Sequence, residues 1–183
     1  MFMSSQELLG LGGREFAKSH IEKRAAYDAS MKKVFISHSS ADTKFIPGVE
    51  KFFGQFGVGV YADVMDERLQ GLPDWGKAVL LKSEIAKCDK LIILVTSATK
   101  TSKWIPWELG IGDGSCGHVH AGLFPVTEQG AEEDWTKQGY MELYPRIHFL
   151  KLNGMDKNGW VVRDPSDGKH WQIRDWLNCR TRR

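Results

Sequence analysis

The chain has 183 residues, of which 42% are hydrophobic and 26% are charged. This length and composition suit one α/β domain with a substantial core, and they exclude a disordered or fibrous protein. The formal net charge is +2, but the last ten residues alone contribute +3, so the rest of the chain sums to −1. A nucleic-acid-binding protein needs a patch of Lys and Arg, which this distribution does not provide.

The three cysteines, Cys88, Cys116 and Cys179, are widely spaced and include no CxxC pair. This pattern argues against a disulfide framework or a structural zinc site and for a reducing compartment, so we expect a cytoplasmic protein. No stretch reaches the roughly 18 to 20 consecutive apolar residues that a membrane helix requires. Glu7 also interrupts the region where a signal peptide would be apolar. We therefore expect no membrane partner and no nucleic-acid partner.

Strands and helices are predicted to alternate in the first half of the chain. Ser4 and Glu7 can form a capping box, which predicts one or two helices over residues 4–29. Farther along, short apolar runs alternate with apolar residues at helical spacing. They predict strands at 34–36, 57–63 and 91–95 and helices at 45–56 and 78–88.

This alternation is typical of a parallel, doubly wound sheet, in which ligands bind at the carboxyl ends of the strands. The candidate site loops are therefore residues 37–42, 63–76 and 96–106.

The second half of the chain gives a weaker pattern. The glycines at 110, 112, 114 and 117 form neither a G-x-G-x-x-G turn nor a Walker A sequence, so we expect a loop there. Further strands are predicted at 123–126, near 147–152 and at 160–162. A turn at 165–168 and a closing helix that holds Trp171, Trp176 and Leu177 complete the prediction.

The segments VFISHS at 34–39, VYAD at 60–63 and SKWIPWEL at 102–109 occur in order and properly spaced, and together they resemble the TIR (Toll/interleukin-1 receptor) domain family. Residues 34–39, VFISHS, resemble its first box, and residues 60–63, VYAD, lead into its long loop after the second strand. Residues 102–109, SKWIPWEL, resemble its S-x-W-x-x-x-E-L motif. The resemblance implies an α/β, flavodoxin-like three-layer fold with a central, mostly parallel five-stranded sheet.

The resemblance also implies a division of the chain and an activity. Residues 1–30 would form an N-terminal helical extension, residues 31–152 the TIR domain, and residues 153–183 a C-terminal extension that packs on the domain. Many prokaryotic members cleave NAD⁺ at the nicotinamide–ribose bond with the Glu of the last motif, here Glu108. The resemblance thus implies an NAD⁺ nucleosidase that gives nicotinamide and ADP-ribose or a cyclic ADP-ribose isomer, with NAD⁺ as substrate and no cofactor.

The same resemblance implies partners and a setting. It suggests self-association through TIR–TIR contacts, a downstream effector that senses the nucleotide product, and signalling in prokaryotic anti-phage immunity of the Thoeris type. Two competing functions stay open from the sequence. One is a non-catalytic TIR scaffold, because many receptor adaptors lack the carboxylate and act by association. The other is a nucleoside deoxyribosyltransferase-like enzyme, which also breaks N-glycosidic bonds with a Glu.

Glu108 suits the implied chemistry. In NAD⁺ the ribose is joined to a cationic pyridinium, so nicotinamide leaves as a neutral molecule and needs no general acid. One carboxylate can therefore suffice, by stabilising the positive charge that develops at the anomeric carbon. Trp104 lies four residues earlier, so on a helix it faces the same way and can form a pocket wall. The ordinary alternative is a Glu stabilised only by a helix dipole and a Trp that belongs to the core.

The resemblance places the other binding residues in loops at strand ends. The residues after the first strand are expected to line the nicotinamide end of the pocket, largely through backbone groups. Asp63 can bind a substrate hydroxyl, although an ordinary turn aspartate fits equally. The loop that contains Leu69 is expected to cover the substrate. The predicted substrate-binding residues are Ile36, Ser37, His38, Ser39, Asp63, Leu69 and Trp104.

Other candidate sites are weaker. The Ser-His-Ser run at 37–39 is no hydrolase triad, since the chain has no G-x-S-x-G elbow. Ser39 and Asp42 instead predict a capping box for the helix that follows. His118 and His120 alternate as metal ligands can, but no matching Cys or carboxylate completes a set, so no metal is expected.

Overall fold

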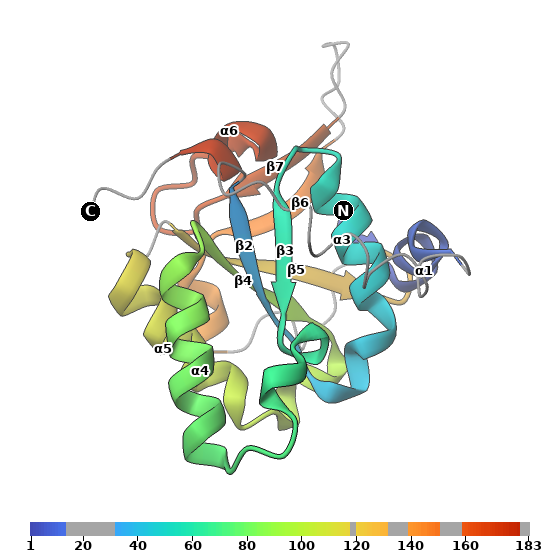
Figure 1. Ribbon diagram of the computed structural model, residues 1–183. Coiled ribbons are helices and arrows are strands. Elements are labelled where there is room, and N and C mark those ends of the chain that lie inside the picture. The colour runs from blue at the N-terminus through green and yellow to red at the C-terminus, as the bar shows by residue number, and fades with distance from the viewer. Residues whose placement is uncertain (14–31, 118–119, 132–138, 151–158, 180–183) are drawn as a thin grey trace.

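The computed structural model describes residues 1–13, 32–117, 120–131, 139–150 and 159–179. Within these ranges, eight strands form one sheet (Figure 1). The strands are β1 (Met3–Ser4), β2 (Lys33–Ser37), β3 (Gly59–Ala62), β4 (Lys90–Val95), β5 (Ala121–Thr127), β6 (Arg146–Leu150), β7 (Gly159–Arg163) and β8 (His170–Gln172).

Five of these strands form a parallel core. Their order is β3-β2-β4-β5-β6, and every neighbouring pair among them runs parallel. This is the strand order of flavodoxin-like folds, so the predicted fold class is confirmed. Beyond β6, the strands β7 and β8 extend the sheet with antiparallel pairs, and β1 pairs parallel with the carboxyl end of β5.

Helices cover both faces of the sheet (Figure 1). One face carries α4 (Asp74–Lys87) and α5 (Trp104–Cys116), and the other carries α1 (Ser5–Gly12), α3 (Ile46–Gly54) and α6 (Ile173–Asn178). Val34 and Ile36 pack toward α3, whereas Phe35 packs toward α4, because successive side chains of a strand point to opposite faces. None of the helices in the described ranges has the length and apolar character needed to cross a membrane.

The first twelve residues pack onto this sheet. Met3 pairs with Val126 of β5, and both Met3 and Leu8 are buried in the core beside α3. Gly48 is required where α1 meets α3, since a Cβ atom there would lie 2.0 Å from the carbonyl oxygen of Leu8. The rest of the predicted N-terminal helical region lies outside the described residues, and the domain boundaries stay predictions.

Two predictions for the second half of the chain are wrong. The predicted glycine loop is mostly helical, because residues 110, 112 and 114 all lie within α5. Gly112 lets this helix approach β4, since a Cβ atom there would lie 2.2 Å from a methyl carbon of Leu91. Close packing thus outweighs the low helix propensity of glycine. Trp171, expected in the closing helix, lies in β8 opposite Val162, and α6 begins two residues later.

Candidate active site

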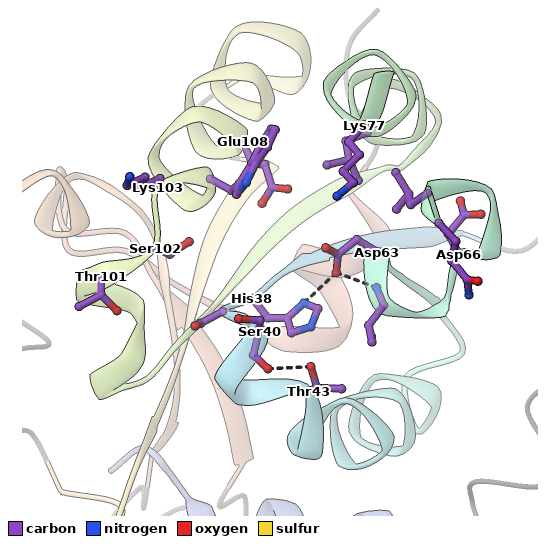
Figure 2. Close-up of a pocket in the computed structure, with 16 residues that line it drawn as sticks. His38, Ser40, Thr43, Asp63, Asp66, Lys77, Thr101, Ser102, Lys103 and Glu108 are labelled. Atoms are coloured by element: carbon purple, nitrogen blue, oxygen red, sulfur yellow. Dashed lines mark hydrogen bonds and ion pairs between the residues drawn. The ribbon is translucent and has the colours of Figure 1, made fainter. Parts of the chain in front are cut away.

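A cavity of about 670 Å³ opens at the carboxyl ends of β2, β3 and β4 (Figure 2). Ligands collect at this edge of parallel sheets because the loops after several strands converge there. The volume falls in the range typical of small-molecule sites. The cavity is lined by His38, Ser39, Ser40 and Thr43 after β2, by Asp63, Val64, Asp66, Leu69 and Gln70 after β3, by Lys77 and Leu81 of α4, and by Thr101, Ser102, Lys103, Trp104 and Glu108 around the start of α5.

Glu108 lies in the second turn of α5, and only 4% of its surface is exposed. The Ser37 hydroxyl, at the carboxyl end of β2, donates a hydrogen bond to Oε2 of Glu108. Burial raises the pKa of Glu108 to about 7; the Ser37 bond opposes this rise, and the negative charge of Asp63 adds to it. A buried carboxylate whose hydrogen bond comes from a neutral hydroxyl is costly to ionise, so it is well suited to meet a positive charge on a ligand.

His38 and Asp63 come from the ends of the adjacent strands β2 and β3, and His38 Nδ1 lies 3.3 Å from Asp63 Oδ1. The side chain of His38 is 2% exposed, whereas that of Asp63 is 44% exposed. Burial lowers the pKa of His38, although the carboxylates of Asp63 and Asp42 oppose the shift. His38 is therefore uncharged at neutral pH, and Asp63 presents an acceptor to the cavity.

Asp42 does not form the predicted capping box with Ser39. Ser39 does cap the short 3-10 helix Ser40–Phe45, since its side chain accepts a 3.4 Å hydrogen bond from the amide of Ala41. Asp42 instead turns inward, where Thr96 Oγ1 donates a 2.7 Å hydrogen bond to Oδ2. The reason is burial: Asp42 is 4% exposed, so its carboxylate needs an interior donor. This bond joins the loops that follow β2 and β4.

The loop after β3 is held by a second buried carboxylate, Asp66. Asp66 accepts hydrogen bonds from Arg68 Nε at 2.9 Å and from the Tyr61 hydroxyl at 2.7 Å. Arg68 also pairs with Glu84 of α4 at 3.0 Å. The Arg68 bonds hold the pKa of Asp66 well below its usual range, despite the opposing effect of burial. The network ties this loop to α4, and Leu69 takes its place in the cavity wall.

Trp104 lines the cavity one helical turn before Glu108, as the spacing predicts. Its ring meets that of Trp107 edge to face, with centroids 5.5 Å apart. The side chain of Ile36, in contrast, is buried in the core on the α3 side of the sheet. Any contact of Ile36 with a substrate therefore has to involve its backbone. Ser37 contacts Glu108 rather than the cavity itself.

Lys77 is a cavity residue that the sequence patterns do not single out. It lies in the first turn of α4, directly after a candidate site loop, and that position is the only signal the sequence carries. Figure 2 shows its ammonium group, the Glu108 carboxyl group and the His38–Asp63 pair turned toward the same space, whereas the Lys103 side chain extends away. The ammonium group of Lys77, the carboxyl groups of Asp63 and Glu108 and the uncharged imidazole of His38 thus face one space in the cavity.

No group of three or more His, Cys, Asp or Glu side chains among the described residues is arranged to hold a metal ion. His118, weighed above as a ligand, lies outside those residues. His120 is buried next to Lys90, the first residue of β4, at the amino ends of the strands and thus opposite the cavity. The absence of a metal stays a prediction.

Among known proteins, a relative has a name that agrees with the motifs. No family model matches the chain. The chain is 26% identical over 166 residues to a protein of Bacillus cereus (strain MSX-D12) named probable 3′ cyclic ADP-D-ribose synthase ThsB′. The match covers 89% of this chain and 81% of that protein. This relative confirms the resemblance that the motifs indicate, since it is named as an enzyme that forms a cyclic ADP-ribose.

Proposed function

We propose that this chain cleaves NAD⁺ at the nicotinamide–ribose bond and releases nicotinamide together with a cyclised ADP-ribose. The observation that carries the proposal is the buried Glu108, which faces a cavity of nucleotide size from its position in the S-x-W-x-x-x-E-L motif. The name of the Bacillus cereus relative supports the cyclic product over free ADP-ribose.

Glu108 acts in this proposal as a fixed negative charge. When the bond between the anomeric carbon and the pyridinium nitrogen breaks, both electrons go to the nitrogen, and nicotinamide leaves uncharged. Positive charge then develops on the ribose, and the Glu108 carboxylate stabilises it at close range in a site of low dielectric. The cationic substrate also favours the ionised form of Glu108, so binding counteracts the raised pKa of the carboxyl group.

Asp63 and His38 hold and deprotonate hydroxyl groups. Asp63 presents a carboxylate that can accept a hydrogen bond from a ribose hydroxyl. A hydroxyl of the substrate that attacks the anomeric carbon has to lose its proton, and uncharged His38 is able to accept it. Attack by water in place of this hydroxyl would give ADP-ribose.

Lys77 and Trp104 orient the rest of the substrate. The ammonium group of Lys77 offers the pyrophosphate of NAD⁺ a positive charge in the cavity. Trp104 offers a ring on which an aromatic group of the substrate can stack. Closing the ring requires the two ends of NAD⁺ to approach each other, and two such anchors in the wall of one cavity favour a folded substrate.

Association and defence belong to the same proposal. Trp75 is 74% exposed and Val79 is 65% exposed, and these residues lie one turn apart on α4. This apolar surface supports contact with a second copy of the chain. The proposed setting is prokaryotic anti-phage immunity, in which an effector would sense the cyclic product.

Mass spectrometry of the products from NAD⁺ tests the proposal. We expect nicotinamide and a cyclic ADP-ribose isomer from the purified chain, alone or under crowding, and neither product from Glu108→Gln. Glu67→Gln, a change of the same type at an exposed residue outside the cavity wall, serves as the control. NAD⁺ binding without turnover would favour the scaffold, and turnover of deoxynucleosides would favour a deoxyribosyltransferase.

A further inference from the structure

A second group of polar side chains lies at the far edge of the sheet, away from Glu108. Here β6, β7 and β8 pair antiparallel; Arg146 lies directly opposite Arg163, and Arg163 lies directly opposite His170. These three side chains therefore form one row across three strands and share a face of the sheet. His148 is two residues along β6 on the same face, and its ring centroid lies 5.8 Å from that of His170.

The row faces a second cavity rather than the core. Ile147 and Val162, which alternate with these residues, are buried on the face that carries α3 and α6. The row therefore occupies the opposite face. A cavity of about 460 Å³ opens over it, and its wall includes Arg146, His148 and Arg163.

Positive charge is concentrated in this row, which favours an anion as the ligand. Like charges directly opposite each other on neighbouring strands destabilise a sheet. Arg163 is exposed, and its guanidinium forms no ion pair within the described ranges. Nε2 of His148 is buried and, in the same part of the chain, has no hydrogen-bond partner. Burial and the nearby positive charges lower the pKa of His148 to about 4, so its ring is uncharged at neutral pH.

We propose that this cavity is a binding site for the phosphate group of a nucleotide-sized anion, separate from the cavity of Glu108. Arg163 supplies a planar pair of donors that matches phosphate oxygens, and the imidazole of His148 supplies a neutral donor. The cavity volume of about 460 Å³ leaves room for a larger group attached to the phosphate. Glu142 in the same wall can accept a hydrogen bond from a sugar hydroxyl, and Phe2 adds an apolar surface. The proposal does not depend on NAD⁺ cleavage.

Titration of the full chain with AMP, followed through the imidazole NMR signals of His148, tests this site. Signals assigned with His148→Gln report this cavity alone, even where AMP also enters the cavity of Glu108. We expect a saturable shift with AMP and none with adenosine, which lacks the phosphate. Arg163→Gln should weaken the affinity by about tenfold or more, because it removes charge-assisted hydrogen bonds.

Two matched variants sharpen the test. Arg163→Lys keeps the charge but loses the paired donors, so its affinity should fall between those of the wild type and Arg163→Gln. Arg174→Gln removes the same charge from α6 and should leave the affinity unchanged. The proposal is overturned if the His148 signals show no saturable shift with millimolar AMP, if adenosine shifts them equally, or if Arg163→Gln binds AMP like the wild type.

Discussion

Two carboxyl groups in the wall of the same cavity, Asp66 and Glu108, are each 4% exposed, yet they have opposite electrostatic character. Asp66 is surrounded by donors from Arg68 and Tyr61, which keep its pKa below the usual range. Glu108 receives a hydrogen bond from the neutral hydroxyl of Ser37, and its pKa is raised to about 7. Both side chains are shielded from solvent, but Glu108 lies deeper in the protein, so burial dominates its pKa, whereas hydrogen bonds from Arg68 dominate the pKa of Asp66. Asp66 is satisfied by the protein, whereas Glu108 is left for a ligand to satisfy.

The largest expected effect separates the two residues by activity. Glu108→Gln should lower kcat/KM for NAD⁺ by about 10²- to 10³-fold or more, because it removes the charge that stabilises the oxocarbenium-like transition state. Nicotinamide release measured at saturating and limiting NAD⁺ gives both constants. Near-normal turnover by Glu108→Gln would show that Glu108 is not catalytic and that the proposed difference in role between Asp66 and Glu108 is wrong.

The next effect concerns stability at Asp66. Asp66→Asn should lower the free energy of unfolding by about 2 to 4 kcal/mol, because it breaks a charge-assisted network and leaves Tyr61 and Arg68 with a neutral partner. Urea unfolding at pH 7 measures this change. If the variant is as stable as the wild type, Asp66 does not hold the loop after β3.

Glu108→Gln should change stability in the opposite direction. The folded-state pKa of Glu108, about 7, lies above the ordinary value of 4.5, so folding favours the protonated form. The stability that protonated Glu108 contributes to the wild type is therefore lost as the pH rises through 7. At pH 8 the variant should therefore be more stable than the wild type, by on the order of 2 to 3 kcal/mol, and at pH 4 the two should be nearly equal. Equal unfolding curves at both pH values would show that ionised Glu108 carries no such cost.

The smallest expected effect tests Ser37 as a positioning residue. Ser37→Ala removes the hydrogen bond that lowers the pKa of Glu108, so the midpoint of the pH dependence of kcat/KM should rise by about one unit. Ser37→Thr keeps a hydroxyl and should return the midpoint toward the wild-type value. An unchanged midpoint in Ser37→Ala would mean that this bond does not tune the carboxyl group.

Much of the parallel sheet can be predicted from the sequence, because its strands are short apolar runs and its inner helices have regular apolar spacing. The segment around Gly112 escapes this approach, since a glycine-rich helix depends on close contact with Leu91, which is distant in sequence. The strand that contains Trp171 depends in the same way on pairing with β7. Such elements are determined by tertiary contacts, which local propensity does not contain.

The candidate site can be predicted in part. Glu108, Trp104 and Asp63 follow from a motif and from the ends of strands, and the structure places all three in one cavity wall. Lys77 does not follow, because one lysine in a helix is indistinguishable from others until the cavity is known. The hydrogen bond between Ser37 and Glu108 also joins residues 71 positions apart, so its effect on the pKa of Glu108 cannot be predicted until the fold is known.

The pH dependence of kcat/KM for nicotinamide release tests the central claim most directly, because it measures activity and the ionisation of the free enzyme together. A catalytic carboxylate with a pKa of about 7 has to be ionised to act, so kcat/KM should be constant above pH 8. Well below pH 7, kcat/KM should fall by about tenfold for each pH unit. A profile that stays flat down to pH 5, or no nicotinamide release at any pH, would contradict the account.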